Sequence, residues 1–241
     1  MKIGLASKEF INNDIQKNTL TIIETMKEAK ENKAQMICFG EAFLQGFDSL
    51  SWNYAKDKVI AITKSSLHIK VISKFANDLD IAVSFGYIEN DNDLLYCSYI
   101  AIDNTGNIIH NFKRVSPGWK ESCDFKYYKE GTELSTFAYK DLTFAIGLCG
   151  DFWYEENIVK VSKLKKDVVL WPLFVDFAIE EFEKQYKEEY AKQVKPLGSK
   201  VLFINSICKK TPSFGGCLEF LDGNILSELP IGNEGILYIE I

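Results

Sequence analysis

One apolar run of the sequence stops abruptly at a thiol: Leu142-Thr143-Phe144-Ala145-Ile146-Gly147-Leu148-Cys149-Gly150-Asp151. Its length and composition predict a buried β-strand, and the glycine after the thiol indicates a turn. Two other strand-length runs stop at a charged residue, Met36-Ile37-Cys38-Phe39-Gly40 before Glu41 and Ile108-Ile109-His110-Asn111-Phe112 before Lys113. We therefore expect a thiol, a carboxylate and an ammonium at the ends of three strands, where functional groups commonly gather.

Segments with helical periodicity alternate with strand-length apolar runs along most of the chain. The apolar positions of 15–29 and of 67–79 each fall on one helix face, with Asn13 or Asp14 as a cap for the first. Residues 177–194 predict a long helix. Further strands are expected at 3–6, 81–87, 95–102, 167–171, 201–205, 217–220, 225–229 and 236–241. No composition break interrupts this order, so residues 1–241 are expected to form one α/β domain with helices outside a predominantly β core.

Composition and charge exclude several function classes. The chain has 241 residues, 46% hydrophobic and 26% charged, which is typical of a globular protein. A net charge of −6 and a pI near 5.2 argue against a nucleic-acid partner, because binding to phosphates depends on clustered Lys and Arg. No apolar stretch approaches the roughly 20 residues that span a bilayer, so no membrane partner is expected.

The motifs of common cofactor and metal sites are missing. Neither the GxGxxG nor the GxxxxGK[ST] pattern occurs, so no nucleotide cofactor is indicated. The six cysteines include no CxxC pair and lie mostly in apolar runs, which predicts neither a structural metal nor a disulfide framework. Such reduced thiols are typical of a cytoplasmic protein.

A nucleophilic cysteine needs a base, and the order of residues in this chain disfavours a histidine in that role. The two histidines, His68 and His110, both precede Cys149, whereas papain-like proteases and α/β-hydrolases place histidine after the nucleophile. Glu41 lies among apolar neighbours that disfavour the charged form of a carboxyl group and so favour proton transfer. Singly, Cys149 could still be a buried structural cysteine, and Glu41 and Lys113 ordinary surface charges.

Taken together, these segments resemble the nitrilase, or carbon–nitrogen hydrolase, superfamily. Phe39-Gly40-Glu41-Ala42-Phe43-Leu44-Gln45-Gly46-Phe47 is similar to its hydrophobic-Pro-Glu motif with a following Gly-aromatic pair. Asn111-Phe112-Lys113 resembles its Tyr-Arg-Lys strand end, and Gly147-Leu148-Cys149-Gly150-Asp151 its cysteine signature. Gly40 stands in place of the usual Pro, and Phe112 in place of the Arg before the lysine. The resemblance covers nearly the whole chain.

The resemblance implies an α-β-β-α sandwich, commonly paired into a homodimer or higher homo-oligomer, and a Glu41–Lys113–Cys149 triad. In that mechanism Glu41 takes the thiol proton, and Lys113 and the Gly150 N–H stabilise the oxyanion. The implied reaction is hydrolysis of a small-molecule amide without cofactor or metal. Some members carry a second carboxylate after the lysine, for which Glu121 is the candidate and Asp124 its competitor.

Two other functions are compatible with the same residues, a soluble acyltransferase and a non-catalytic dimeric interaction module. Aromatic side chains near the three strand ends could line a substrate pocket or simply be core. The pocket candidates are Phe47, Trp119, Trp153 and Phe174.

Overall fold

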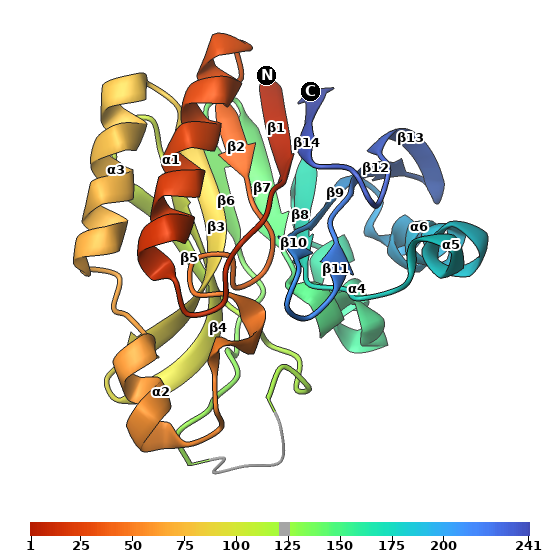
Figure 1. Ribbon diagram of the computed structural model, residues 1–241. Coiled ribbons are helices and arrows are strands. Elements are labelled where there is room, and N and C mark those ends of the chain that lie inside the picture. Colours follow the sequence, from red (N-terminus) through yellow and green to blue (C-terminus); the bar gives the residue numbers. More distant parts are fainter. Residues whose placement is uncertain (121–125) are drawn as a thin grey trace.

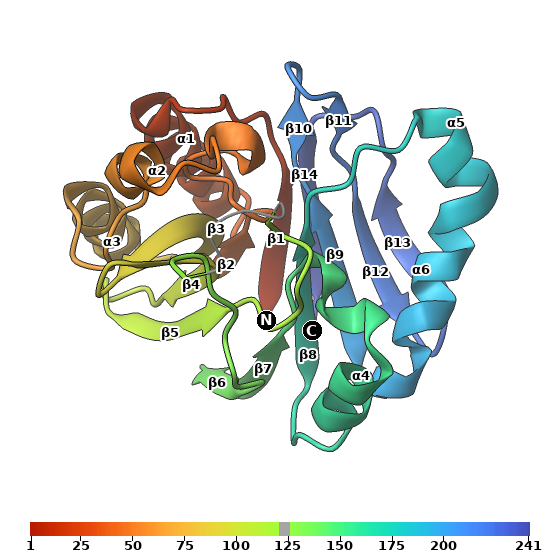
Figure 2. The same ribbon diagram turned by 90° about the horizontal axis from the view of Figure 1, so that it is seen from below.

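Two β-sheets lie face to face in the computed structural model, which describes residues 1–120 and 126–241, and helices cover the outer face of each sheet (Figures 1 and 2). The first sheet has the order β14 (Gly235–Glu240), β1 (Lys2–Ser7), β2 (Met36–Cys38), β3 (Ala82–Asp91), β4 (Leu94–Ile102), β5 (Ile108–Lys113). The second has the order β13 (Asn224–Leu229), β12 (Cys217–Leu221), β9 (Lys200–Asn205), β8 (Val168–Leu173), β7 (Leu142–Ile146), β6 (Thr136–Tyr139). A short ribbon pairs β10 (Ile207–Cys208) with β11 (Ser213–Phe214).

Each sheet has a parallel centre and antiparallel flanks. Strands β1, β2 and β3 pair in parallel in the first sheet, and β7, β8 and β9 do so in the second. The expected carboxylate, Glu41, follows β2 in the first sheet, and the expected thiol, Cys149, follows β7 in the second. Parallel strands end at the same edge, so the two groups emerge at one end of the sandwich.

The helices follow from their apolar stripes and caps. Helix α1 (Ile15–Glu31) begins after Asp14, whose carboxylate accepts a hydrogen bond from the Lys17 backbone N–H at 2.9 Å. Helix α3 (Leu67–Leu79) packs beside α1 on the first sheet, as Figure 2 shows. On the second sheet lie α4 (Glu155–Ser162) and α6 (Lys187–Val194), and α5 (Ile179–Glu181) leads into α6.

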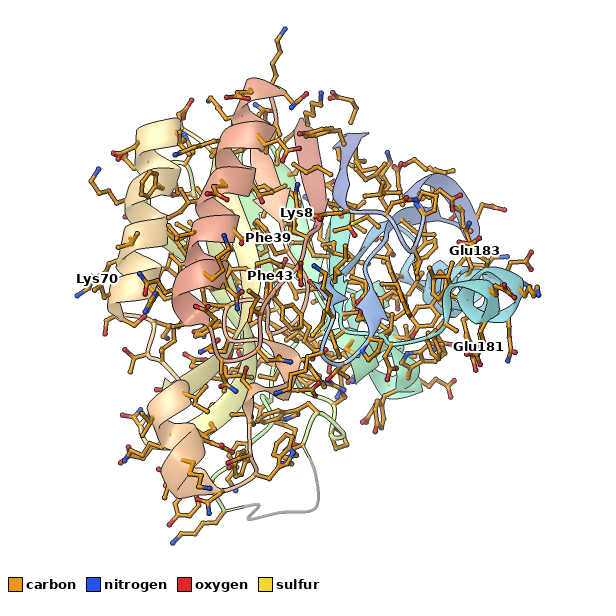
Figure 3. The ribbon with its side chains drawn as sticks, in the orientation of Figure 1. Lys8, Phe39, Phe43, Lys70, Glu181 and Glu183 are labelled. Atoms are coloured by element: carbon orange, nitrogen blue, oxygen red, sulfur yellow. The ribbon has the colours of Figure 1, made fainter. Side chains whose placement is uncertain are left out.

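Three apolar layers hold the sandwich together, one between the sheets and one beneath the helices of each sheet. The layer between the sheets includes Leu5, Cys97, Tyr99, Phe112, Ile146 and Leu170. Phe39 and Phe43 belong to the layer under α1 and α3, and Figure 3 shows both in the interior while Lys70, Glu181 and Glu183 project outward. Burial of this kind contributes about 25 cal/mol per Å² of apolar surface. The expected α-β-β-α order is confirmed.

Several elements differ from the sequence expectations. Helix α2 (Tyr54–Ile60), helix α4 and strand β6 were not expected, because each is too short to show a clear period. The long helix expected at 177–194 is interrupted by a π-helical turn at Phe182–Tyr186. In the described part of the chain, no helix is both long and apolar enough to cross a membrane.

Candidate active site

Glu41 lies in a tight turn that begins where β2 ends. The Glu41 backbone N–H donates to the carbonyl of Leu173 on β8, at 3.2 Å, so the turn is tied to the opposite sheet. On β3, Gly86 allows the turn to approach, because a Cβ there would lie 2.2 Å from the backbone nitrogen of Ala42. At Gly40 a Cβ would lie 2.3 Å from Ser206 Oγ, which explains glycine at that position.

The Glu41 carboxylate is fully buried and its two oxygens differ. Oε1 accepts hydrogen bonds from Arg114 Nη1 at 2.8 Å and from Cys97 Sγ at 3.3 Å. Oε2 is buried and has no hydrogen-bond partner among the residues that the structure describes. A buried oxygen without a donor is costly in a resting protein, and this oxygen is free to accept a hydrogen bond from a ligand.

The cation beside Glu41 is Arg114, and not the expected Lys113. Side chains alternate along β5, so Phe112 and Arg114 face the interior between the sheets while Lys113 faces the other side. Lys113 Nζ lies 2.5 Å from Asp91 Oδ2 and 3.7 Å from the centre of the Tyr96 ring, away from Glu41. This placement corrects the position of the cation by one residue.

The sequence also indicates that Arg114 is the inward-facing basic residue at the end of β5. Phe112-Lys113-Arg114 repeats the aromatic-basic-basic order of the Tyr-Arg-Lys strand end one residue later than the alignment used above. Read in that register, arginine stands where the resemblance implies lysine.

The Arg114 guanidinium is held on several sides. It is 5% exposed, and its Nε donates to Ser116 Oγ at 3.0 Å. Burial alone would lower the pKa of Arg114, but the Glu41 carboxylate outweighs it and the pKa is raised. Arg114 is therefore a permanent cation in this site.

Cys149 follows β7 in a strained turn that faces the same groups. Its φ of +39° is in the left-handed region, which is rare for a residue with a side chain. The Trp171 indole N–H donates to the Cys149 carbonyl at 2.9 Å and fixes the turn. Among the described cysteines, Cys149 alone is partly exposed. Burial, followed by the Glu41 carboxylate, raises the pKa of the Cys149 thiol to about 12.

Gly150 and Asp151 join this turn to the Arg114 segment. A Cβ at Gly150 would lie 2.4 Å from Arg114 Nη2, so only glycine leaves the guanidinium in place. The buried Asp151 carboxylate accepts hydrogen bonds from the backbone N–H groups of Val115, Ser116 and Leu148 at 3.1, 2.7 and 2.8 Å. Asp151 thus ties the end of β7 to the segment after β5.

The pocket candidates separate into two groups. Phe47 and Phe174 stack with ring centres 4.7 Å apart, and the Phe174 carbonyl lies 4.0 Å from Cys149 Sγ. Trp119 is buried beside Trp52 and Tyr128, whereas Trp153 is 39% exposed and packs edge-on against Tyr190. Glu121 and Asp124 lie outside the described residues.

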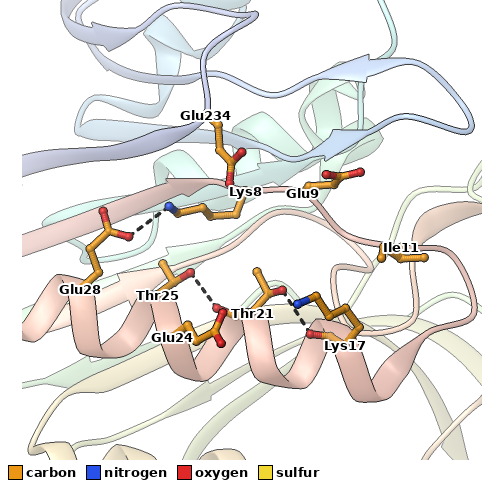
Figure 4. Close-up of a pocket in the computed structure, with 9 residues that line it drawn as sticks. All are labelled: Lys8, Glu9, Ile11, Lys17, Thr21, Glu24, Thr25, Glu28 and Glu234. Carbon is orange, nitrogen blue, oxygen red and sulfur yellow. Dashed lines mark hydrogen bonds and ion pairs between the residues drawn. The ribbon is translucent and has the colours of Figure 1, made fainter.

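A separate cavity of about 310 Å³ lies beside α1 (Figure 4). Its lining is mostly charged and carries carboxylates paired with lysines, as Lys8 Nζ with Glu28 Oε2 at 3.1 Å. Its lining contains none of Glu41, Arg114 and Cys149, so this cavity is separate from the candidate active site.

Comparison with known proteins places this geometry in context. The family model described as carbon-nitrogen hydrolase matches residues 3–189. A glutamine-dependent NAD(+) synthetase of Thermotoga maritima is 23% identical over 157 residues, 64% of this chain and 26% of the relative. An arylacetonitrilase of Hypocrea virens is 26% identical over 132 residues, 52% of this chain and 40% of the relative. The chain thus spans well under half the length of these curated relatives.

Two solved structures share the fold. A glutamine-dependent NAD+ synthetase from Acinetobacter baumannii superimposes with a TM-score of 0.79 and 22% identity, covering 98% of this chain and 44% of that chain. A nitrilase-superfamily amidase from Nesterenkonia superimposes with a TM-score of 0.78 and 16% identity, covering 100% of this chain and 90% of that chain. In a glutamate-to-glutamine mutant of the Nesterenkonia amidase, acrylamide has undergone Michael addition at the active-site cysteine. At these identities the likeness establishes the fold.

Proposed function

The chain belongs to the carbon-nitrogen hydrolase family, and from this premise we propose that it hydrolyses a small non-peptide amide through a thioester on Cys149. The observation that carries the proposal is the buried ion pair of Glu41 and Arg114 beside the strained Cys149 turn. Base, cation and thiol come from three separate strand ends, and such convergence of ionisable and nucleophilic groups marks reaction centres.

In the proposed reaction Glu41 carries the protons. Because the pKa of the Cys149 thiol is raised to about 12, the resting sulfur keeps its proton at neutral pH. Glu41 accepts that proton as the sulfur attacks the amide carbonyl carbon. It then returns the proton to the nitrogen as the C–N bond breaks, and the amine leaves. Glu41 next takes a proton from water, whose oxygen attacks the thioester and releases the acid and the thiol.

Arg114 takes the part expected of Lys113 in this proposal. An arginine does not give up its proton at any ordinary pH, so it stabilises charge and leaves all proton transfer to Glu41. Its Nη2 lies against Gly150, whose backbone N–H is the second proposed donor to the oxyanion. Phe47 and Phe174 are proposed to contact the acyl group.

A substrate screen tests the proposal directly. The panel contains glutamine, small primary amides and arylacetonitriles, because the similar proteins are called a glutamine-dependent synthetase, an amidase and an arylacetonitrilase, and release of ammonia is the readout. We expect turnover of at least one amide by the native protein and none by Cys149→Ala. Ammonia release that persists in Cys149→Ala would refute the thioester mechanism.

The same screen separates the alternatives. Adding a simple amine such as methylamine separates a hydrolase from an acyltransferase by the product ratio, because an acyltransferase forms the N-methyl amide in preference to the free acid. Absence of both ammonia release and an acyl-enzyme adduct across the panel, the latter measured by intact mass, would favour the non-catalytic module. We also propose a cytoplasmic homodimer, and light scattering after size-exclusion chromatography measures the oligomeric state.

A further inference from the structure

Cys97 contacts the site through both its side chain and its backbone, although the proposed reaction gives it no part. It lies on β4, between Ile88 of β3 and the end of β5, and is 1% exposed. Its thiol is 3.3 Å from Glu41 Oε1, and its carbonyl accepts the Arg114 backbone N–H at 2.9 Å. One residue therefore touches both members of the buried ion pair.

The hydrogen bonds around Glu41 make its two oxygens unequal. Oε1 has two donors, Arg114 Nη1 and the Cys97 thiol, whereas Oε2 has none among the described residues. The terminal torsion of a glutamate is broad and roughly two-fold, so one donor alone does not settle which oxygen faces which partner. Two donors on one oxygen, from two different strands, fix the plane of the carboxylate.

We propose that Cys97 is a positioning residue that holds Glu41 Oε1, so that Oε2 is the atom that receives the Cys149 proton. The inference rests on the proposed function for the role of Glu41. In this step the S–H bond of Cys149 breaks, its electron pair stays on sulfur, and the proton forms a bond to Oε2. The Cys97 thiol keeps its own proton throughout.

The surroundings of Cys97 keep it a donor. Burial, and next the Glu41 carboxylate, raise the pKa of the Cys97 thiol well above its ordinary value, so it stays protonated across the working pH range. The other titratable groups facing Glu41 are Arg114 and Cys149; Asp151 acts on Arg114, and Tyr190 faces Cys149. Cys97 and Arg114 both donate to Oε1 of this carboxylate, and the Cys149 thiol also interacts with Glu41.

Alkylation of Cys149 by iodoacetamide tests the role without any substrate. The reaction forms a carbon–sulfur bond, releases iodide and requires loss of the thiol proton, and its rate is measured by peptide mass against pH. Three variants are compared with the native protein: Cys97→Ala removes the donor, Cys97→Ser keeps one, and Cys217→Ala removes a buried thiol from the same layer. Thermal midpoints are measured beside the rates.

We expect Cys97→Ala to slow alkylation of Cys149 about tenfold or more near neutral pH, with Cys97→Ser and Cys217→Ala within about threefold of native. The pH profile of the rate in Cys97→Ala should differ from that of the native protein, whereas Cys97→Ser, which keeps a donor to Oε1, should retain the native profile. A native-like rate and profile in Cys97→Ala would overturn the proposal, as would equal slowing in the alanine and serine variants. Failure of the amide screen would instead count against hydrolysis alone.

Discussion

Replacing Arg114 with Met removes the cation of the buried pair and keeps much of the side-chain volume. Glu41 is fully buried and Arg114 is 5% exposed, so the remaining carboxylate would have no charged partner and no access to water. Breaking a buried pair in this way costs about 3–5 kcal/mol. For a chain of this size we expect the thermal midpoint to fall by about 6–20 °C.

Lys113→Met is the matched control, one position earlier on the same strand. Lys113 is partly exposed and paired with Asp91 at the surface, where such pairs contribute about 0–1 kcal/mol. Urea unfolding at pH 7 gives the free energy of unfolding for both variants. The single variant Glu41→Gln and the double variant Glu41→Gln/Arg114→Met complete a double-mutant cycle. We expect it to give a coupling free energy between Glu41 and Arg114 of about 1–3 kcal/mol. If Arg114→Met costs no more than Lys113→Met, the assignment of Arg114 as the cation of the site is wrong.

Three other perturbations test the site from different sides. Iodoacetamide should label Cys149 before the other described cysteines, and because its pKa is raised to about 12, labelling should still accelerate between pH 8 and pH 10; a plateau by pH 9 would contradict this. Glu41→Gln should remain folded by circular dichroism yet lose at least about 10²-fold in amide turnover, because the amide cannot carry the proton; near-native turnover would exclude Glu41 as the base. Gly86→Ala should cost about 1–3 kcal/mol of stability, because its Cβ meets the Ala42 nitrogen, whereas Gly235→Ala has room and should change little in the same unfolding assay.

Much of the fold was predictable because most of its elements are long enough to show a period. Helix α1 and helix α3 were expected within two residues of their observed ends, and their caps are local. Helix α2 has 7 residues and β6 has 4, too few for a clear pattern. The break at Phe182–Tyr186 leaves the apolar positions of the long helix in place, so the pattern does not reveal it.

The site was predictable in part, and its error has a simple cause. Glu41 and Cys149 each follow a buried strand, so they could be placed at strand ends without knowing which face of a strand points inward. The cation depends on which face of β5 points inward, and a shift of one residue exchanges the faces. The role of Cys97 could not be predicted, because it lies in an apolar strand sequence like any buried cysteine. Its hydrogen bond to Glu41 forms only between residues that are far apart in the sequence.

The bond from the Glu41 N–H to the Leu173 carbonyl joins the two halves of the sandwich at the proposed reaction centre. The turn with Glu41 follows a strand of the first sheet, and the turn with Cys149 follows a strand of the second. Neither sheet alone therefore carries both Glu41 and Cys149. Separation of the sheets would therefore abolish reactivity before any helix unfolds. The Glu41 amide should exchange its hydrogen only when the sandwich opens, at a rate set by the opening free energy of the whole interface.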